Sequence, residues 1–235
     1  MATTLEGRLD SIELLKSLSP ADMRQLEKQA VWRRYAAGEQ VLDRSSLSRD
    51  VFFVVQGRVN VVNYSLGGRE IAYASVGAGG FFGELSAIDG EPRSASVVAG
   101  ERCLVATVTP DIFNDVLLKN PQIMHLVLSR LVRIIRTSNE RIMDLSTLGA
   151  VQRVHLELLR MAEPDPLQPN SWLIYPMPTQ SQIAGRASTT RETVARVISQ
   201  LQSSGIVRRK DKSLYIKDRA RLEAVAARLG PSGEE

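Results

Sequence analysis

The sequence is poor in the residues that hold disulfides and metal ions. Cys103 is the only cysteine among 235 residues, and His125 and His155 are the only histidines. A single thiol cannot form a disulfide within the chain, hold an iron–sulfur cluster or form a cysteine-rich zinc site. The two histidines are too far apart along the chain to suggest a metal site by spacing. The sequence therefore predicts no disulfide scaffold, no metal and no haem.

Long apolar runs are also absent. No run of about eighteen apolar residues occurs, so we expect no transmembrane helix and no membrane partner. The N-terminus lacks the basic segment and apolar core of a secretory signal, which predicts a cytoplasmic protein. With 43% hydrophobic and 24% charged residues the composition is that of a globular protein, and the length suits one large domain or two ordinary ones.

Positive charge is concentrated in the last third of the chain. Residues 151–235 carry 13 Lys and Arg against 9 Asp and Glu, whereas residues 1–150 carry 17 of each, so the net charge of +4 arises after residue 150. Within 186–221 the count is 10 against 3. This placement favours a polyanion-binding face, although a solvated basic surface accounts equally well for the counts alone.

The first half of the chain changes from a helical to a β-type pattern. Residues 5–30 predict a helix that Ser19-Pro20 breaks into two pieces. From about 36 to 110, short apolar runs alternate with glycine turns. Strands are predicted at 51–55, 59–62, 71–73 and 103–108. Many short strands separated by glycine turns are typical of a sandwich or double-sheet roll.

A helical period follows from 111 to 148. Its seam advances by alternating steps of four and three residues, which is the heptad pattern of a coiled coil. The seam residues are Met124, Leu128, Leu131, Ile135, Ser138, Ile142 and Leu145. Extra apolar residues at Ile123, Val127 and Ile134 predict that part of the helix docks on the roll. The spacing favours a parallel homodimer over packing within one chain, and Ser138 is either a register-fixing polar position or a ligand contact.

The segment 79–96 has the ingredients of an anion site. Gly83 permits close backbone approach, and the amides after it can point at an anion. Arg93 supplies a planar fork for phosphate oxygens, and Ser94 adds a hydroxyl and an amide. Glu84 can accept hydrogen bonds from a ribose hydroxyl. Taken alone, the pattern fits a structural ion pair between Glu84 and Arg93 equally well.

The run 82–95 resembles the phosphate-binding cassette of cyclic-nucleotide-binding domains. The glycine-glutamate-leucine start, the Pro92-Arg93 pair and their spacing match, and the resemblance extends upstream to the turn glycines Gly38 and Gly57. It implies that Glu84 binds the ribose 2′-hydroxyl and that Arg93 and Ser94 bind the cyclic phosphate. The implied ligand residues are Gly83, Glu84, Leu85, Arg93, Ser94, Ser138 and Asn139.

The last two of these residues lie on the long helix. In the family that this sequence resembles, a hydroxyl residue on the long helix contacts the base of the nucleotide bound to the same subunit. The next residue of the helix contacts the base bound to the partner subunit. The matching pair Ser138-Asn139 departs modestly from the Thr-Ser or Thr-Asn of many relatives that respond to cyclic AMP. At the position of Ser94, a serine is associated with cyclic AMP in the bacterial branch of the family, and a hydroxyl residue is associated with cyclic GMP in the kinase branch. Cyclic AMP is the expected ligand, and cyclic GMP or a cyclic dinucleotide is the alternative.

Residues 179–203 predict two short helices with a turn near 187–189. Thr190 is the predicted N-cap of the second helix, while Thr189 and Glu192 offer a capping box that would give Glu192 a purely structural role. Arg191 and Arg196 are five residues apart, about 140° around a helix, so with Glu192 they can fan across one major groove. Arginine reads guanine bidentately, and glutamate accepts from cytosine.

The segment 190–196 closely resembles the recognition helix of the cyclic AMP receptor protein (catabolite activator) family. The resemblance implies that Arg191, Glu192 and Arg196 read bases and that Thr190 and Thr193 touch phosphate. Ser188 stands where many relatives have glycine. Further contacts with the DNA backbone are expected from Gln180 and from the wing residues Arg208, Arg209, Lys210 and Lys212. Solvated side chains are the alternative for the wing cations.

The two motifs in this order resemble the cyclic AMP receptor protein/fumarate-nitrate regulator superfamily over nearly the whole chain. The implied fold is α+β. Its parts are a cyclic-nucleotide-binding β-roll (jelly roll) with N-terminal helices at 1–118, a dimerisation helix at 119–148, a winged helix-turn-helix at 149–230 and a disordered tail at 231–235.

The implied function is that of a transcription regulator. It would bind cyclic AMP and then, as a homodimer, a pseudo-palindromic TGTGA-type site on double-stranded DNA, with RNA polymerase as a further partner. A regulator that binds DNA constitutively is the main alternative. An enzyme is disfavoured because the pocket offers no nucleophile–base pair and no metal cluster.

Overall fold

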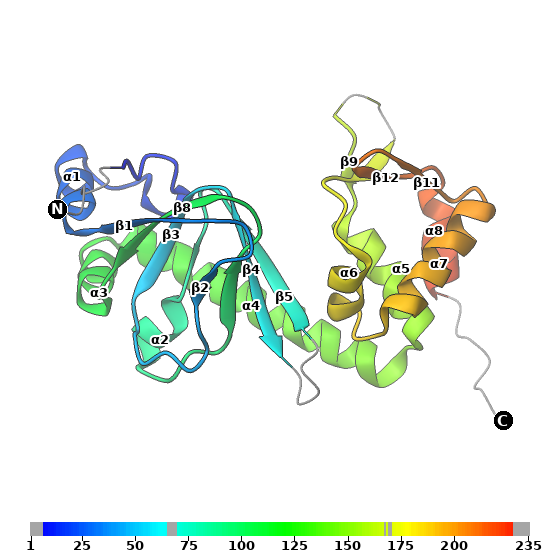
Figure 1. Cartoon of the computed structure of the whole chain (residues 1–235), viewed down its shortest axis with the longest axis horizontal. Coiled ribbons are helices and arrows are strands. Elements are labelled where there is room, and N and C mark those ends of the chain that lie inside the picture. Colours follow the sequence, from blue (N-terminus) through cyan, green and yellow to red (C-terminus); the bar gives the residue numbers. More distant parts are fainter. Residues whose placement is uncertain (1–6, 65–69, 167, 169–170, 228–235) are drawn as a thin grey trace. The chain divides into compact units, whose positions relative to one another are not determined.

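The chain forms two compact units, Met1–Ile135 and Arg136–Glu235, and each has its own hydrophobic core. The computed structural model describes residues 7–64, 70–166, 168 and 171–227. The predicted α+β fold class is confirmed, with a β-roll, a long helix and a helix-turn-helix followed by a β-hairpin wing (Figure 1). The tail predicted to be disordered, 231–235, lies outside the described residues.

Two antiparallel four-stranded sheets build the roll. One has the order β1-β8-β3-β6 and the other β2-β7-β4-β5. The strands are β1 (Val31–Tyr35), β2 (Gln40–Leu42), β3 (Val51–Gln56), β4 (Arg58–Tyr64), β5 (Glu70–Gly77), β6 (Phe81–Phe82), β7 (Ser96–Ala99) and β8 (Cys103–Val108). The strand runs predicted from the sequence fall within β3, β4, β5 and β8.

Strand β3 shows why this sequence forms a buried strand. Val51 and Phe53 belong to one core cluster, whereas Phe52 and Val54 belong to another. Successive side chains of a strand point to opposite faces, so a strand that is covered on both faces is apolar throughout. The run Val51–Val54 is therefore buried at every position.

The helices of the roll unit are shorter than the sequence suggests at the N-terminus. They are the 3₁₀ turn η1 (Glu13–Leu15), α1 (Pro20–Gln29), α2 (Glu84–Asp89), α3 (Pro110–Lys119) and the first part of α4 (Pro121–Thr147). The prediction of a helix over 5–30 is wrong for residues 7–12, where Leu9 and Ile12 are buried but not helical; residues 5 and 6 lie outside the described residues. Ser19 caps α1 by accepting a hydrogen bond from the Asp22 amide.

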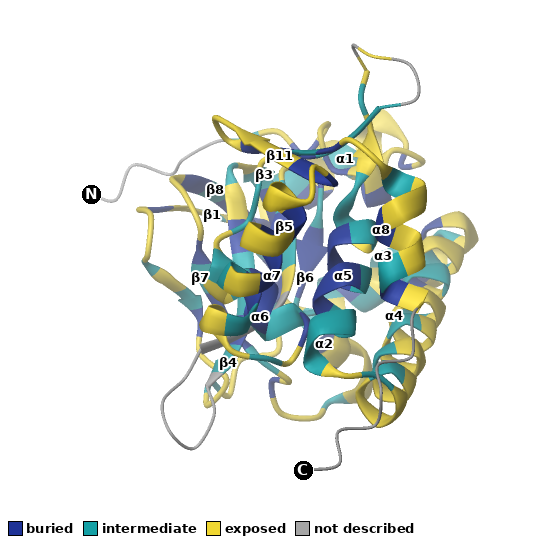
Figure 2. Ribbon diagram, turned by 90° about the vertical axis from the view of Figure 1, so that its right-hand side faces the viewer, coloured by how far each residue is buried: buried dark blue, intermediate teal, exposed yellow. Residues whose placement is uncertain are grey.

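The long helix α4 buries little of its apolar surface. Ile123 and Val127 are buried in the roll core, and Met124 and Leu131 are partly buried against it. The expected docking of Ile134 is wrong, because this side chain is 44% exposed. The other apolar seam residues, Leu128, Ile135, Ile142 and Leu145, are between 49% and 60% exposed. Figure 2 shows exposed colour along much of α4.

The second unit packs helices on a small antiparallel sheet of order β11-β12-β10-β9. After the end of α4 come α5 (Ala150–Met161), β9 (Glu163–Pro164), β10 (Trp172–Ile174), α6 (Gln180–Arg186), α7 (Arg191–Ser203), β11 (Val207–Lys210), β12 (Ser213–Ile216) and α8 (Arg219–Ala227). The core joins Leu158 of α5, Ile183 of α6 and Val194, Val197 and Leu201 of α7. These α7 residues recur every three or four positions, which leaves the opposite face of the helix free.

Gly57 is the most constrained turn glycine of the roll. It has φ +82°, and a Cβ there would lie 2.4 Å from the carbonyl oxygen of Arg102 and 2.9 Å from Cys103 Sγ. Gly38 has the same φ, but a Cβ at this position would meet nothing within 4 Å among the described residues, so it provides a matched control.

We expect Gly57→Ala to lower the free energy of unfolding by about 3 kcal/mol, since backbone strain adds to overlap with a fixed carbonyl. Gly38→Ala should lower the free energy of unfolding by only about 1 kcal/mol, because it adds backbone strain without a steric overlap. Denaturant unfolding of the full chain measures both. Equal losses for the two variants would show that the close approach at Gly57 does not matter.

Candidate functional site

The candidate ligand site begins at the turn between β6 and α2. Gly83 is the N-cap of α2 with φ +86°, a conformation that glycine adopts without strain. A Cβ there would lie 2.8 Å from the Asp50 carbonyl oxygen and 3.0 Å from an Arg93 nitrogen. The glycine therefore lets the backbone and the guanidinium of Arg93 come together.

Arg93 is buried, with 4% of its surface exposed. Its Nη1 donates to the Gly83 carbonyl at 3.0 Å, and its Nη2 donates to the Asp50 carbonyl at 2.8 Å and to Ser48 Oγ at 3.2 Å. Burial lowers the pKa of Arg93, and the negative charges of Asp50 and Glu84 act in the opposite direction. The guanidinium is thus held by the loop before β3 and by the start of α2.

The Nε–H donor of Arg93 is not used by these hydrogen bonds. The Nε atom is buried and makes no hydrogen bond within the described part of the chain. The guanidinium lies 5.7 Å from the ring centroid of Phe52, which stacks on Phe82 at 4.9 Å. A buried unpaired donor on a cation, beside an aromatic floor, fits an anionic ligand oxygen.

Glu84 does not form the ion pair with Arg93 that the sequence left open. It is 4% exposed, and its Oε1 lies 3.6 Å from Nε of Arg130 on α4. The Arg130 guanidinium also lies 4.2 Å from the ring centroid of Phe81. Sequence reasoning missed Arg130, because nothing local in the sequence relates it to a glutamate more than forty residues earlier.

The other predicted ligand residues are placed as follows. Ser94 is exposed, and its carbonyl accepts a hydrogen bond from Asn63. Leu85 is 37% exposed on α2. Ser138 and Asn139 are exposed on α4, in the part of the helix that belongs to the second unit. The structure therefore brings Gly83, Glu84 and Arg93 together, and it leaves the helix pair untested.

The helix-turn-helix is built by two capped helices. Thr179 caps α6 by accepting a hydrogen bond from the Gln182 amide, and Gln182 completes the capping box. Thr190 caps α7 by accepting a hydrogen bond from the Thr193 amide, as predicted. Thr190, and not Thr189, is therefore the N-cap residue of α7, and Glu192 is exposed in the first turn of this helix.

The turn between the two helices has a strained backbone. Ser188 adopts φ +48°, a left-handed conformation that glycine adopts more readily than serine. Arg153 of α5 secures the turn: its Nε donates to the Ala187 carbonyl at 2.9 Å and its Nη2 to the Ser188 carbonyl at 3.0 Å. Its Nη1 donates to the Leu148 carbonyl at 2.7 Å. This side chain was not anticipated from the sequence, because its partners are backbone atoms.

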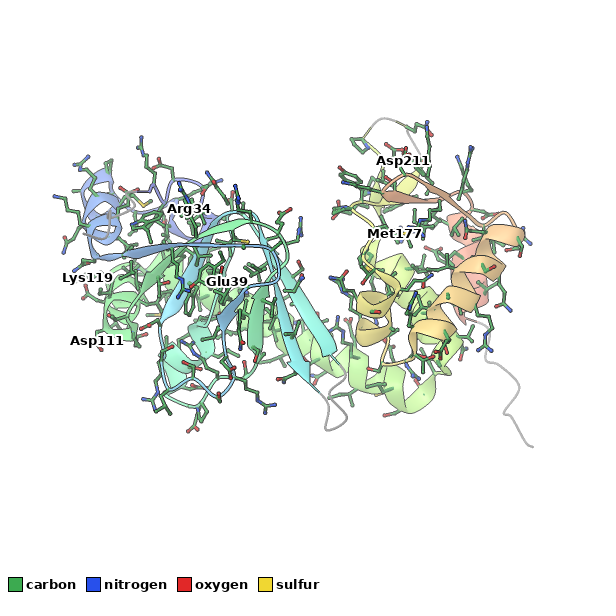
Figure 3. All side chains as sticks on the ribbon, viewed as in Figure 1. Arg34, Glu39, Asp111, Lys119, Met177 and Asp211 are labelled. Atoms are coloured by element: carbon green, nitrogen blue, oxygen red, sulfur yellow. The ribbon has the colours of Figure 1, made fainter. Side chains whose placement is uncertain are left out.

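The predicted DNA-contacting residues lie on α6, on α7 and on the β11–β12 hairpin. Arg191 and Arg196 are carried by α7 and are both exposed, while Gln180 at the start of α6 and Thr193 are half-buried. The exposed hairpin residues are Arg208, Arg209, Lys210 and Lys212. Asp211, with φ +52°, forms the hairpin tip (Figure 3). The arrangement offers one polar helix face and a basic hairpin to a polyanion.

The described part of the chain offers neither a metal cluster nor a membrane-spanning helix. It contains no group of three or more His, Cys, Asp or Glu side chains that could hold a metal ion. Over the same ranges no helix has the length and apolar content needed to cross a membrane.

Two family models match the chain. The model described as a cyclic nucleotide-binding domain matches residues 32–120, and the model described as a Crp-like helix-turn-helix domain matches residues 152–225. The chain is also 29% identical over 194 residues to the cyclic AMP receptor protein of Thermus thermophilus, a match that covers 83% of this chain and 87% of that protein.

Solved structures show the same fold. A CooA variant from Carboxydothermus hydrogenoformans covers 96% of this chain and 98% of its own, with a TM-score of 0.77 at 21% identity. The regulator CLP from Xanthomonas campestris, described as responsive to c-di-GMP, covers 84% and 99%, with a TM-score of 0.68 at 17% identity. The chain carries a cyclic nucleotide-binding domain and a DNA-binding helix-turn-helix. It is a ligand-responsive transcription regulator that belongs to the cyclic AMP receptor protein/fumarate-nitrate regulator superfamily.

Proposed function

We propose that this regulator binds cyclic AMP in the roll and then binds a pseudo-palindromic TGTGA-type DNA site as a homodimer. The observation that carries the proposal is the buried Arg93, whose Nε lacks a partner among the described residues next to Gly83 and Glu84. A cyclic phosphate supplies the missing acceptor. The ribose 2′-hydroxyl supplies a donor for Glu84, whose carboxylate is already buried and oriented by Arg130.

Nucleotide binding changes the partners of Arg93. Without ligand, two of its nitrogens donate to the Gly83 and Asp50 carbonyls and to Ser48. A phosphate oxygen competes with these acceptors and offers a stronger, charge-assisted hydrogen bond. The loop that carries Ser48 and Asp50 is then free to shift. Gly83, Leu85 and Ser94 complete the proposed phosphate and ribose contacts, and Ser138 and Asn139 are proposed to contact the base.

The base is assigned to adenine on the strength of the resemblance and of a relative named for cyclic AMP. A second candidate ligand is a cyclic dinucleotide, because a regulator of the same fold is described as responsive to c-di-GMP. Cyclic GMP is the third, since Ser94 suits it in another branch of the family. Direct competition between the three nucleotides decides among them.

The homodimer is proposed from the exposed apolar stripe on α4. Leu128, Ile135, Ile142 and Leu145 share the heptad seam and are all roughly half exposed in the single chain. A stripe of this length along a helix of 27 residues matches the seam of a two-stranded coiled coil. The partner is therefore a second copy. RNA polymerase is proposed as a partner from the family alone.

DNA reading is assigned to the outward face of α7. Arg191, Glu192 and Arg196 are proposed to contact base edges, and Thr190 and Thr193 to contact phosphate. The sugar–phosphate backbone of the DNA is proposed to be contacted by Gln180 and by the wing cations Arg208, Arg209, Lys210 and Lys212. In a dimer, two such helices about 34 Å apart would enter successive major grooves, and ligand binding would shift the population toward that spacing.

The first test measures DNA binding and ligand binding together. We expect cyclic AMP to tighten binding to a labelled TGTGA-type palindrome at fixed salt, and cyclic GMP to have little effect. Arg93→Ala should abolish the response, because about two charge-assisted hydrogen bonds are lost, and binding of the nucleotide itself should weaken about 100-fold. Fluorescence anisotropy on the DNA and calorimetry on the nucleotide measure the two effects.

Arg34→Ala serves as the matched control, because this arginine is exposed on β1 and is not one of the proposed ligand residues. Tight DNA binding that is the same with and without nucleotide would reject the ligand proposal. It would leave the DNA proposal intact.

The second test separates base reading from phosphate binding. Arg191→Ala should lower discrimination at one base pair of each half-site by about 1–3 kcal/mol, with modest loss on unrelated DNA. Lys212→Ala should weaken binding to every sequence alike and reduce the salt dependence, since it removes one phosphate contact. Binding to a palindrome and to single-base variants measures both. The same loss on every sequence for both variants would reject the assignment of Arg191.

The third test addresses the seam. Ile135→Glu should dissociate the dimer, because it places a charge on the proposed interface, while the isolated chain should stay folded since Ile135 is 59% exposed. Arg136→Glu, one residue further on the same helix and also exposed, is the control and should remain dimeric. Sedimentation velocity measures mass, and circular dichroism checks folding. A dimeric Ile135→Glu protein would place the interface elsewhere.

A further inference from the structure

A groove between α1 and α3 is lined by residues other than those of the candidate ligand site and of the helix-turn-helix. It encloses about 930 Å³ of space that is partly open to solvent. α1 contributes Asp22, Gln25 and Gln29, which recur at three- and four-residue steps on one face. α3 contributes a matching face that includes Asp111 and Asp115. Figure 3 labels Asp111 and Lys119 on α3, at the edge of this unit.

The floor of the groove is apolar. Leu18 and Leu26 are buried there, and Ile112 and Val116 of α3 are partly buried beside them. These side chains belong to the roll core, so the floor is rigid and already shaped. Leu18 and Leu26 are already almost fully buried, so the apolar surface that an occupant can remove from water comes from Ile112 and Val116.

The rim of the groove is acidic. It carries Asp22, Asp111 and Asp115 against a single cation, Lys119. Lys119 is already paired with Asp115 at 2.7 Å. Within the described ranges, Asp22 and Asp111 lie within ion-pair distance of no cation. The rim therefore has two carboxylates to offer to positive charges of an occupant.

We propose that this groove docks a basic amphipathic helix of a partner protein. The apolar floor selects apolar side chains at helical spacing, and the carboxylates of Asp22 and Asp111 select lysine or arginine on either flank. DNA is excluded as the occupant by the sign of the charge. The first six residues of the chain carry Glu6 and neither Lys nor Arg, so their side chains do not complement the rim either. The groove thus gives the regulator a protein-binding surface separate from its ligand and DNA sites.

The test uses a fluorescein-labelled helical peptide of about eighteen residues, with leucines spaced three and four apart and lysines on both flanks. The full-length protein should bind it. The double variant Asp22→Asn/Asp111→Asn should bind it about tenfold more weakly at low salt, because two surface ion pairs are lost. Val116→Ala should also weaken binding, severalfold, because it removes part of the apolar floor.

The controls are chosen on the same unit. Asp10→Asn/Glu101→Gln removes two exposed carboxylates outside the groove and should leave peptide binding unchanged. A peptide with glutamates in place of the lysines, and one with the same residues in scrambled order, should not bind. Nucleotide binding should be the same in all variants, which keeps this result independent of the proposed function.

Three outcomes would overturn the proposal: no binding of the basic peptide, equal weakening by both double variants, or equal binding of the scrambled peptide. A fourth would overturn it by reassigning the groove to a second copy of this chain. That outcome is self-association at high protein concentration that Asp22→Asn/Asp111→Asn removes and Ile135→Glu does not.

Discussion

A buried guanidinium needs hydrogen-bond acceptors in every state of the protein, and Arg93 imposes this constraint on the whole ligand site. The cation can be buried only because Gly83 has no side chain to keep the Asp50 and Gly83 carbonyls away from it. Those carbonyls fix the start of β3 and the start of α2 relative to one another. The Nε–H of the guanidinium is buried and has no partner among the described residues. A donor that is held in place by the other hydrogen bonds of the same side chain is already oriented toward an acceptor.

Helix α4 keeps much of its apolar surface exposed to water, because the roll covers only its first turns. Its first turns bury Ile123 and Val127, and Arg130 pairs with the glutamate of the ligand site. Beyond this point the apolar seam is exposed. Exposing so many large apolar side chains in one stripe is unfavourable for a monomer in water. The same helix therefore pairs with Glu84 through Arg130 and exposes a stripe of large apolar side chains beyond it.

The sequence predicted the parts of this structure that local pattern determines. The heptad seam, the runs of β3 and β8, the Thr190 cap and the glycine at the start of α2 each depend on a few neighbouring residues. It did not predict β6 and β9, which are two residues long and lack any periodicity. Nor did it predict the partners of Glu84 and Arg93. Tertiary packing decides which cation pairs with a given carboxylate. Every residue has a backbone carbonyl, so the sequence does not show which carbonyl accepts a hydrogen bond from a side chain. Ile134 was misassigned because a helical stripe does not reveal where the covering sheet ends.

The contacts of Arg153 extend the argument from the ligand site to the DNA-reading helix. One guanidinium joins the carbonyl just beyond α4 to the two carbonyls of the turn that precedes α7. Ser188 in that turn is already strained at φ +48°, so its position depends on these hydrogen bonds. The turn before α7 is therefore held to α5 through its backbone carbonyls as well as through the apolar core of the second unit, so the start of α7 is positioned by Arg153 and not by the residues of the turn alone.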